Sequence, residues 1–543
     1  MSVQRREGSP ARSRPTWLLW LVLAALWLGS LPVRPLLDPD EGRYAEIPRE
    51  MWVSGDWITP RLDGLKYFEK PPLQYWGTAA LYEVFGLSEW TARLWTVGLA
   101  FLCLPAVFAW ARQLYGREAG LAALAALAVT PYFALVGHLN LLDPGFTFWL
   151  SAAVLALTRG LCEPEGSSGE QRWVLAAWLT AGLAVLSKGV VVPVLAGSTL
   201  AVYMLLERDW RLLRRLHCIA GGLLFLVVSA PWFILVTLRN PEFPGFFFVH
   251  EHFARFLTNV AQRVEPWWYF LPLMAVAALP WWPALGTRSP NLDRNRDSLF
   301  KPLKLLVLFS IVTLVFFSFS GSKLAPYVLP TMPVLAAVVG VRVARRPSLL
   351  RRVLQSTSGL LLLAALGVLV YGLERNGRVP TSVGIWIGVA AIAAIAAVLA
   401  TPRTSSLERV AWVAAASAVV GWQALLIAYT AVPPVRSSAA IVAASKPFVR
   451  PGTLLFSVGQ YRPTLSPYLE RTVQPVSFTG ELEFGFAQEP ARQMSEESFL
   501  ESWRGSRDAI AFVDSRVLEQ WRRRGLAGRI IAADAYTVVV SRL

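Results

Sequence analysis

Charged side chains are scarce in this sequence. Only 16% of its 543 residues are Asp, Glu, Lys or Arg, whereas 55% are hydrophobic and the mean hydropathy is +0.45. A soluble chain of this size carries more charge on its surface. The composition therefore excludes an ordinary soluble protein and predicts an integral membrane protein.

Cysteine and histidine are also scarce. The chain has three cysteines, which lie far apart, and four histidines. A disulfide framework is therefore not expected. No internal repeat and no Gly-rich nucleotide-binding loop is visible in the sequence.

Positive charge exceeds negative charge by 16. A basic chain can bind nucleic acid, but these cations occur in short clusters between apolar segments. Such clusters are typical of cytoplasmic loops that contact anionic lipid headgroups. We expect membrane lipids as partners, and no nucleic acid.

Apolar segments recur through residues 1–431, which we interpret as a transmembrane domain. About thirteen of them approach the length that a helix needs to cross a bilayer. They predict a mostly α-helical, polytopic bundle. The segments are 16–36, 90–111, 118–136, 143–160, 172–187, 189–206, 217–238, 267–286, 303–320, 326–343, 353–373, 382–400 and 409–431.

The basic loops alternate with loops of a different character. If the N-terminus lies inside, all strongly basic loops fall on the cytoplasmic side, and the unusual polar residues fall on the outer side. The active face is therefore expected outside the cytoplasm. The cations of the basic loops are Arg112, Arg117, Arg208, Arg211, Arg214, Arg215, Arg288, Arg294, Arg296, Lys301, Arg342, Arg345, Arg346, Arg351, Arg352, Arg403 and Arg409.

The last part of the chain, residues 432–543, changes character. Runs typical of β-strands at 453–458, 509–514 and 535–541 alternate with amphipathic helical stretches at 499–503 and 517–524. We expect a small α/β domain outside the membrane.

The first outer loop contains two charged stretches. "DPDEGRYAEIPREM", residues 38–51, includes Asp40, Glu41 and Arg43, and "GLKYFEKPPLQYW", residues 64–76, includes Glu69 and Lys70. The first stretch can be a helix on the membrane surface, and one interpretation is that its charges only pair with each other in solvent. The two prolines after Lys70 instead indicate a rigid backbone that fixes the direction of this lysine.

Two further outer positions have a structural and a functional interpretation. Asp143 in "GHLNLLDPGF" precedes Pro144, which is typical of a helix N-cap. Lys188 in "LSKG" stands at the outer end of a span, where a lysine often extends to the interface. Both residues can also face a ligand.

The loop at residues 240–270 contains His250, Glu251 and Arg255. Glu251 and Arg255 are four residues apart and can form an ion pair on a helix. A divalent metal bound by Glu69 and His250 is an alternative. Further on, "SFSGSKLAPYVLPTMP" contains Lys323 and Tyr327 in a span broken by glycine and proline. Irregular backbone at membrane depth is tolerated where it lines a cavity.

The outer loops together bring cations and carboxylates to one membrane boundary. Arginine binds phosphate with a two-pronged fork, and lysine binds it as a point charge. Carboxylates beside them can orient the hydroxyl or amine groups of a sugar, or act as a base. The expected ligand is a lipid that carries a phosphate and a polar headgroup.

The first outer loop, "DPDEGRYAEIPREMWVSGDWITPRLDGLKYFEKPPLQYWG", resembles that of the bacterial aminoarabinose transferases of lipid A. These are membrane glycosyltransferases of the GT-C class, related to protein O-mannosyltransferases. The similarity continues through "LNLLDPGFTFWL", "LSKG", "FFFVHEHFARF" and "GSKLAPYVLPTMP", and covers about residues 15 to 335. It implies a GT-C helix bundle with outer juxtamembrane helices and a periplasmic C-terminal domain.

The resemblance implies transfer of 4-amino-4-deoxy-L-arabinose from undecaprenyl phosphate to a lipid A phosphate, at the periplasmic face of the bacterial inner membrane. Such a modification lowers negative surface charge and hence polymyxin binding. No cofactor is required by this chemistry, although a divalent metal at Glu69 and His250 stays open. Asp40 and Asp143 match catalytic aspartates. Arg43, Lys70, Lys188 and Arg255 match the donor-phosphate side, and the pocket and its entrance include Glu69 and Tyr327, with Glu41 and Lys323.

Two other functions stay open. One is a transferase that uses a polyprenyl-phosphate sugar, such as mannose, to modify a protein or another glycan. The other is a lipid transporter or flippase, which also needs a cavity for a headgroup. Polar chemistry at one membrane face disfavours a transporter, because alternating access places binding sites near the midplane.

Overall fold

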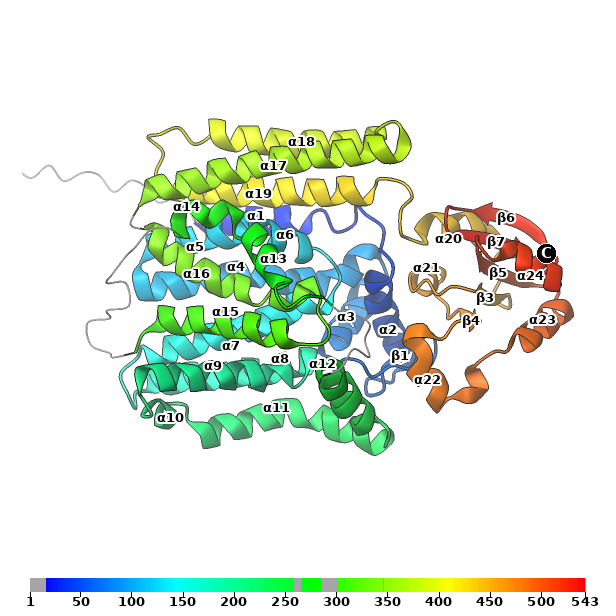
Figure 1. Cartoon of the computed structure of the whole chain (residues 1–543), viewed down its shortest axis with the longest axis horizontal. Helices are drawn as coiled ribbons and strands as arrows, with labels where there is room; N and C mark the ends of the chain where they lie inside the picture. The colour runs from blue at the N-terminus through cyan, green and yellow to red at the C-terminus, as the bar shows by residue number, and fades with distance from the viewer. Residues whose placement is uncertain (1–15, 258–264, 286–299, 345, 543) are drawn as a thin grey trace, which may run out of the picture.

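Helices packed side by side make up most of the molecule, and a small mixed α/β domain lies at one end of them (Figure 1). The computed structural model describes residues 16–257, 265–285, 300–344 and 346–542. Arg288, Arg294, Arg296 and Arg345, assigned above to basic loops, lie outside the described residues. The predicted fold class, a helical membrane bundle with a small C-terminal domain, is confirmed.

Six helices in the described part of the chain are long and apolar enough to cross a membrane. They are α4 (Glu89–Tyr115), α11 (Cys218–Arg239), α15 (Pro302–Phe319), α17 (Pro347–Asn376), α18 (Thr381–Leu399) and α19 (Leu407–Thr430). The count of about thirteen spans stays a prediction. The other bundle helices are α1 (Thr16–Leu28), α5 (Arg117–Val129), α7 (Leu142–Leu161), α8 (Ser168–Lys188), α9 (Val191–Glu207), α10 (Leu212–Arg215) and α16 (Thr331–Ala344).

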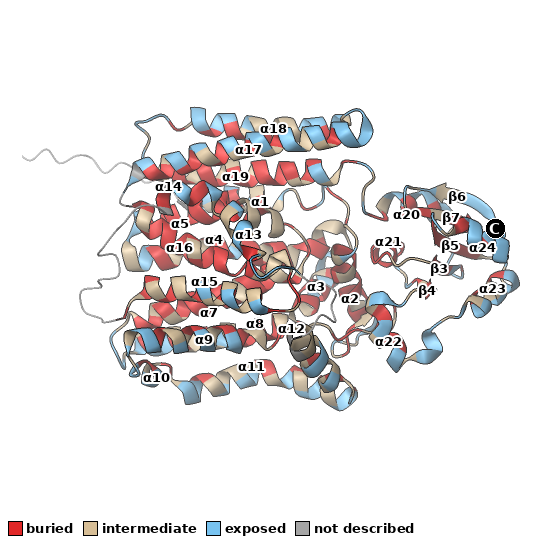
Figure 2. Cartoon of the chain, in the orientation of Figure 1, coloured by how far each residue is buried: buried red, intermediate tan, exposed pale blue. Residues whose placement is uncertain are grey.

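Small residues allow the central helices to approach closely. Every residue of α5 from Ala119 to Val129 is buried, and a side chain added at Gly340 of α16 would lie 2.4 Å from the backbone nitrogen of Ala123. Close packing of alanine and glycine stabilises helix pairs in membranes, where lipid offers no hydrophobic drive for association. Buried residues accordingly concentrate inside the bundle, and exposed ones lie on its outer helices (Figure 2).

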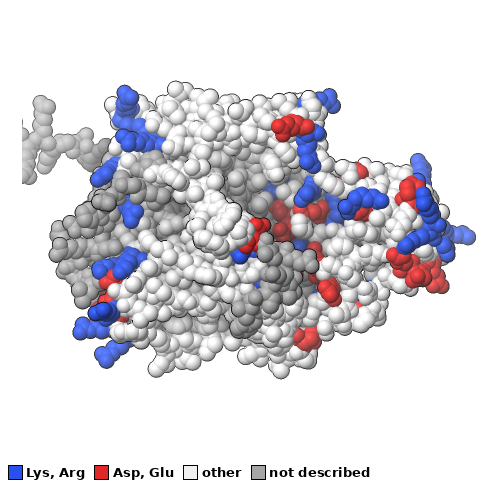
Figure 3. Space-filling view, viewed as in Figure 1, with Lys and Arg blue, Asp and Glu red and all other residues white. Residues whose placement is uncertain are grey.

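Charge is distributed by depth along the bundle. In Figure 3, Lys and Arg gather at the end far from the C-terminal domain, an uncharged belt follows, and charges of both signs gather near that domain. A belt without charge is what a hydrocarbon layer requires. The arrangement agrees with a multi-span protein embedded in a membrane.

Two spans that we predicted as continuous are interrupted. The segment 118–136 is divided into α5 and α6 (Pro131–Val136), and 267–286 into α13 (Phe270–Ala277), the 3₁₀ turn η2 (Leu279–Trp281) and α14 (Trp282–Leu285). The predictions were wrong because Pro131 and Pro280 have no N–H to donate to the preceding turn. The predicted break after α15 is confirmed, since a 3₁₀ turn, η3 (Ala325–Val328), precedes α16.

The first outer loop folds against the end of the bundle. It contains α2 (Asp40–Ser54), a two-stranded hairpin of β1 (Arg61–Leu62) and β2 (Leu65–Lys66), and α3 (Leu73–Phe85). Ten residues of α2 are buried, so the interpretation as a solvated surface helix is wrong: the C-terminal domain and the bundle cover it. A π-helix, η1 (Gly245–Ala254), followed by α12 (Arg255–Leu257), lies in another outer loop.

The C-terminal domain has a five-stranded sheet in the order β4-β3-β5-β7-β6. β3 (Leu454–Val458) pairs in parallel with β4 (Gln474–Val476) and β5 (Ala509–Asp514), whereas β7 (Thr537–Ser541) is antiparallel to β5 and to β6 (Arg529–Ala533). Phe499, Trp503 and Trp521 pack on one face of this sheet. Its remaining elements are α20 (Ala439–Ser445), η4 (Lys446–Phe448), α21 (Leu465–Leu469), η5 (Gly480–Leu482), α22 (Glu483–Gln488), η6 (Pro490–Arg492), α23 (Glu496–Gly505) and α24 (Leu518–Arg524).

Candidate active site

Lys70 and Arg255 come from different outer loops and meet at one carboxylate. Glu251 Oε2 lies 2.7 Å from Arg255 Nη1 and 3.3 Å from Lys70 Nζ. Glu69 lies farther away, 3.9 Å from Arg255 and 4.0 Å from Lys70. The expected Glu251–Arg255 ion pair is confirmed, and the two cations share one carboxylate in a single charge cluster.

Burial raises the pKa of Glu251, but the opposing charges of Lys70 and Arg255 hold it below its ordinary value. The carboxylate is therefore ionised at neutral pH. The Nε of Arg255 is buried and has no hydrogen-bond partner among the described residues. Because an unpaired buried donor costs free energy, this N–H is available to an anionic ligand.

Arg43 on α2 contacts carboxylates from both domains. Its Nη1 lies 3.2 Å from Asp40 Oδ1, its Nη2 pairs with Glu481 on η5, and its guanidinium carbon lies 5.9 Å from the centre of the Tyr67 ring. The Nε of Arg43 is also buried without a partner in the described part of the chain. The sequence carried no signal for Glu481, because nothing in its own segment links it to residues more than 400 positions earlier.

Asp143 and Lys188 form a third part of the site. Lys188 Nζ pairs with Asp143 and lies 5.0 Å from the ring centre of Phe146 and 4.7 Å from that of Tyr327. The interpretation of Asp143 as an N-cap is wrong, because α7 begins at Leu142 and no side chain caps it. The carboxylate instead faces the lysine, and both side chains are largely buried, so Lys188 does not extend into solvent.

Tyrosines connect these three parts. Tyr44 of α2 stacks on Tyr75, with ring centres 6.2 Å apart. Burial raises the pKa of Tyr44, and the charges of Asp40 and Asp143 act on it in the same direction. Tyr327, whose ring centre lies 4.7 Å from Lys188 Nζ, also interacts electrostatically with Arg255. The sequence-predicted residues therefore share one outer region.

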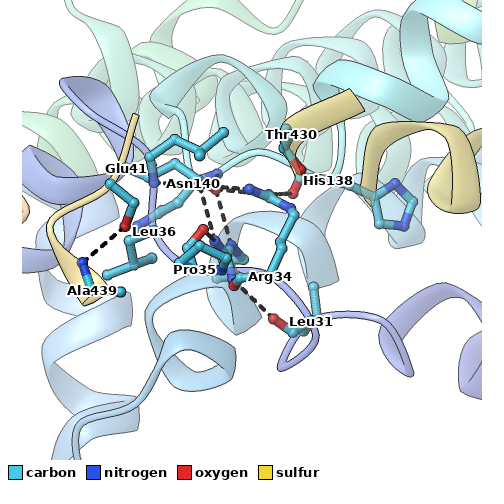
Figure 4. A network of polar contacts seen from close by, with 12 residues as sticks. Leu31, Arg34, Pro35, Leu36, Glu41, His138, Asn140, Thr430 and Ala439 are labelled. Carbon is cyan, nitrogen blue, oxygen red and sulfur yellow. Dashed lines mark hydrogen bonds and ion pairs between the residues drawn. The ribbon is translucent and has the colours of Figure 1, made fainter. Parts of the chain in front are cut away.

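Glu41 and Lys323 have partners of their own. Arg34 and Arg93 both clasp the carboxylate of Glu41, at 2.6 and 2.9 Å, and the backbone N–H of Asn140 donates to it at 2.9 Å (Figure 4). Burial raises the pKa of Glu41, but the two guanidinium groups hold it well below its ordinary range. Lys323 Nζ donates to the carbonyl oxygen of Ser320 at 2.7 Å.

The clasp at Glu41 fixes the outer end of the bundle. Arg93, which lies in the second turn of α4 and is fully buried, also donates to backbone carbonyls of the segment that leads into α2. In Figure 4, Arg34 and Glu41, which belong to one segment, lie close to Asn140 of another. We therefore assign Glu41 a positioning role. An arginine inside an apolar segment was the available signal for this network.

In the described part of the chain, Glu69 and His250 do not belong to a group of three side chains spaced to hold a metal ion. His250 Nδ1 lies 3.5 Å from Glu251, and the His250 ring stacks on Phe246 with centres 5.2 Å apart. Among the described residues, the one group of three side chains spaced to hold an ion is a different one, Glu46, Glu50 and Asp63. The metal at Glu69 and His250 stays a prediction.

That second carboxylate group joins α2 to the C-terminal domain. Asp63 accepts hydrogen bonds from Tyr461 at 2.7 Å and from the backbone of Val473 at 3.0 Å. Glu50 accepts the N–H of Gly64 at 3.0 Å. Nearby, Arg462 donates to Asp38 at 3.0 Å. The C-terminal domain is therefore attached directly behind the helix that carries Asp40 and Arg43.

Two family models match the chain. One, described as dolichyl-phosphate-mannose-protein mannosyltransferase, matches residues 16–294, and the other, the aminoarabinose transferase C-terminal domain, matches residues 441–542. The first covers the outer loops that supply most of the site. The second covers the domain that supplies Glu481.

Curated relatives and solved structures are similar over much of the chain. The undecaprenyl phosphate-alpha-4-amino-4-deoxy-L-arabinose arabinosyl transferase of Pseudomonas paraeruginosa is 35% identical over 61% of this chain and 60% of its own length. That of Aeromonas hydrophila is 32% identical over 68% of this chain and 70% of its own length. The crystal structure of ArnT from Cupriavidus metallidurans bound to undecaprenyl phosphate has a TM-score of 0.87 and 34% identity, covering 97% of this chain and 98% of that one.

Proposed function

Because the chain belongs to the family of the bacterial undecaprenyl phosphate-aminoarabinose arabinosyl transferases, we propose that it moves 4-amino-4-deoxy-L-arabinose from undecaprenyl phosphate to a phosphate of lipid A. We place this reaction at the periplasmic face of the inner membrane. The basic end of the bundle lies far from the C-terminal domain, which contacts the site through Glu481. The positive-inside rule assigns that basic end to the cytoplasm.

The observation that carries this proposal is the meeting of Lys70 and Arg255 at a single oxygen atom. Two cations from separate loops, held at the membrane boundary, suit the phosphate of a lipid donor. Arg43 adds a third cation with a buried, unpartnered N–H. Carboxylates of Asp40, Glu69 and Glu481 surround this arginine and suit the cationic amine of the sugar.

The reaction that fits these groups is an inverting displacement. An oxygen of the acceptor phosphate attacks the anomeric carbon, and the bond from that carbon to the undecaprenyl phosphate oxygen breaks. The departing phosphate takes the bonding electrons and gains one negative charge. Lys70, Arg255 and Arg43 would stabilise this charge in a site shielded from water, an effect that can reach several kcal/mol.

The aspartates orient the reacting groups in this scheme. The acceptor phosphate is already anionic at neutral pH, so no strong base is obligatory. Asp40 would hold the amine of the donor sugar. Asp143, which pairs with Lys188, would orient the acceptor. An Asp40→Asn variant should lower transfer in membranes at least about tenfold. Full transfer by this variant would remove Asp40 from the mechanism.

A second candidate function is mannosyl transfer to a protein or another glycan. It is favoured by the match of residues 16–294 to the mannosyltransferase family model. The cationic cluster would serve that reaction equally well, because the leaving group is again a polyprenyl phosphate. The acceptor is what distinguishes the two.

Mass spectrometry of lipid A separates these candidates. The chain would be expressed in a Gram-negative strain that makes the aminoarabinose donor but lacks its own transferase, with a Lys70→Ala variant as the inactive control. A pentosamine-sized addition to lipid A phosphate, absent from the control, supports the proposal. Unchanged lipid A together with altered glycoproteins would favour the second candidate and overturn the first.

A further inference from the structure

Glu251 stands between two cations that the proposed reaction needs for the donor phosphate. One of its oxygens lies 2.7 Å from Arg255 and 3.3 Å from Lys70. An oxygen held between a guanidinium and an ammonium group is the environment that a phosphate oxygen would occupy there. The carboxylate side chain is only 6% exposed, so it is a built component of the site.

A donor phosphate and Glu251 therefore compete for the same two cations. Adding a phosphate beside an unmoved carboxylate would place two anions around one charge cluster, which is unfavourable in a buried site. Glu69 already lies within 4.0 Å of both cations and adds to this repulsion. Binding of the phosphate is thus easier if Glu251 gives up its position.

The segment that carries Glu251 has a backbone suited to such a change. Glu251 lies in η1, a ten-residue π-helix, and Arg255 follows where the α-helical pattern resumes. π-Helical hydrogen bonding is less stable than α-helical bonding and is frequent at functional sites. A change in this register can withdraw Glu251 while Arg255 stays at the cluster.

We propose that Glu251 is an internal substitute for the polyprenyl phosphate: it holds Lys70 and Arg255 in place, yields to the donor, and returns to displace undecaprenyl phosphate after transfer. The inference rests on the proposed function and deepens it. The phosphate leaves with more negative charge than the donor carried, so the cations bind the product more tightly than the substrate. A competing carboxylate relieves this product inhibition.

The test is binding of undecaprenyl phosphate to the purified full-length protein in nanodiscs. Glu251→Gln keeps the size of the side chain and removes its charge. We expect this variant to bind undecaprenyl phosphate about tenfold more tightly than the unaltered protein. In the transfer assay, both the kcat of this variant and its KM for the donor should fall.

Glu242→Gln is the matched control. Glu242 lies just before the same π-helix and forms an ion pair with Lys66 at 2.6 Å, away from the cluster. Its removal should leave undecaprenyl phosphate binding unchanged. A Glu251→Asp variant keeps the charge on a shorter side chain, and its affinity for undecaprenyl phosphate should lie between those of the unaltered protein and Glu251→Gln. It replaces Glu251→Gln in the test if that variant does not fold.

Unchanged or weaker binding by Glu251→Gln and Glu251→Asp would overturn the inference and make Glu251 a residue that only positions the cations. This outcome is separable from failure of the proposed function. Binding uses undecaprenyl phosphate alone, whereas the function is tested by the addition to lipid A. If Glu251→Gln binds undecaprenyl phosphate more tightly but the unaltered protein leaves lipid A unmodified, the substitute role of Glu251 is supported and lipid A is rejected as the acceptor.

Discussion

Burial makes single charges in this site depend on their partners. Asp143 and Lys188 form an ion pair with each other, and their side chains are only 15% and 11% exposed. If the two act as a unit, Asp143→Asn and Lys188→Gln should each lower kcat/KM for transfer at least about tenfold, and the double variant should be no worse than the poorer single one. The exposed pair Arg117–Glu408, 53% and 37% exposed, is the control and should be neutral when removed. Additive losses at Asp143 and Lys188 would contradict the coupling.

Residues with local signatures were predictable, and residues defined by distant partners were not. Asp143, Lys188 and Arg255 stand out because charge at the end of an apolar segment is unusual. Glu41 looks equivalent to Asp40 in the sequence, yet the clasp by Arg34 and Arg93 makes it structural. Only the fold brings residues from two separate segments around one carboxylate.

Helices and strands also divide into those with a local sequence pattern, which were predictable, and those that depend on distant partners, which were not. Strands β3, β5 and β7 coincide with the predicted runs to within two residues at each end, because each is a continuous β-branched or apolar stretch. β4, three residues long with a proline, and β6, mostly exposed, were missed. They have no periodic pattern and exist through pairing with β3 and β7.

The junction of α8 and α9 offers a prediction for an element. Gly189 has φ +100°, and a Cβ there would lie 2.6 Å from Nε2 of His252 and 3.0 Å from the ring of Phe247. Gly189→Ala should therefore strain the junction and destabilise the fold by about 1 to 3 kcal/mol. Gly197→Ala in α9, where the added Cβ meets nothing within 4 Å, should be neutral or stabilising.

Thermal unfolding in detergent checks this pair of variants. A lowered midpoint for Gly189→Ala alone would show that the junction needs glycine. Because His252 lies in the π-helix with Glu251, the strain should also reach the cation cluster and lower transfer. Equal midpoints for both variants would reject the steric argument.

At the scale of the whole molecule, buried carboxyl groups join the C-terminal domain to α2. Glu50 is 9% exposed and lies with Glu46 and Asp63, with Arg49 as the nearby cation. Burial and the charge of Asp63 raise the pKa of Glu50 to about 7. The attachment of the domain that supplies Glu481 is therefore sensitive to protonation near neutral pH.

The sign of this dependence follows from linkage. The unfolded chain releases the Glu50 proton near the ordinary value of 4.5, whereas the folded protein holds it to about 7. Between these values the folded state binds more protons, so stability falls as pH rises, by at most about 3 kcal/mol for this group. Glu50→Gln should therefore raise the unfolding midpoint at about pH 8 and leave it unchanged at about pH 5. Glu497→Gln, at an exposed position, is the control and should leave the unfolding midpoint unchanged at both pH values. If the midpoint of Glu50→Gln followed pH in parallel with that of the unaltered protein, a role for Glu50 would be contradicted.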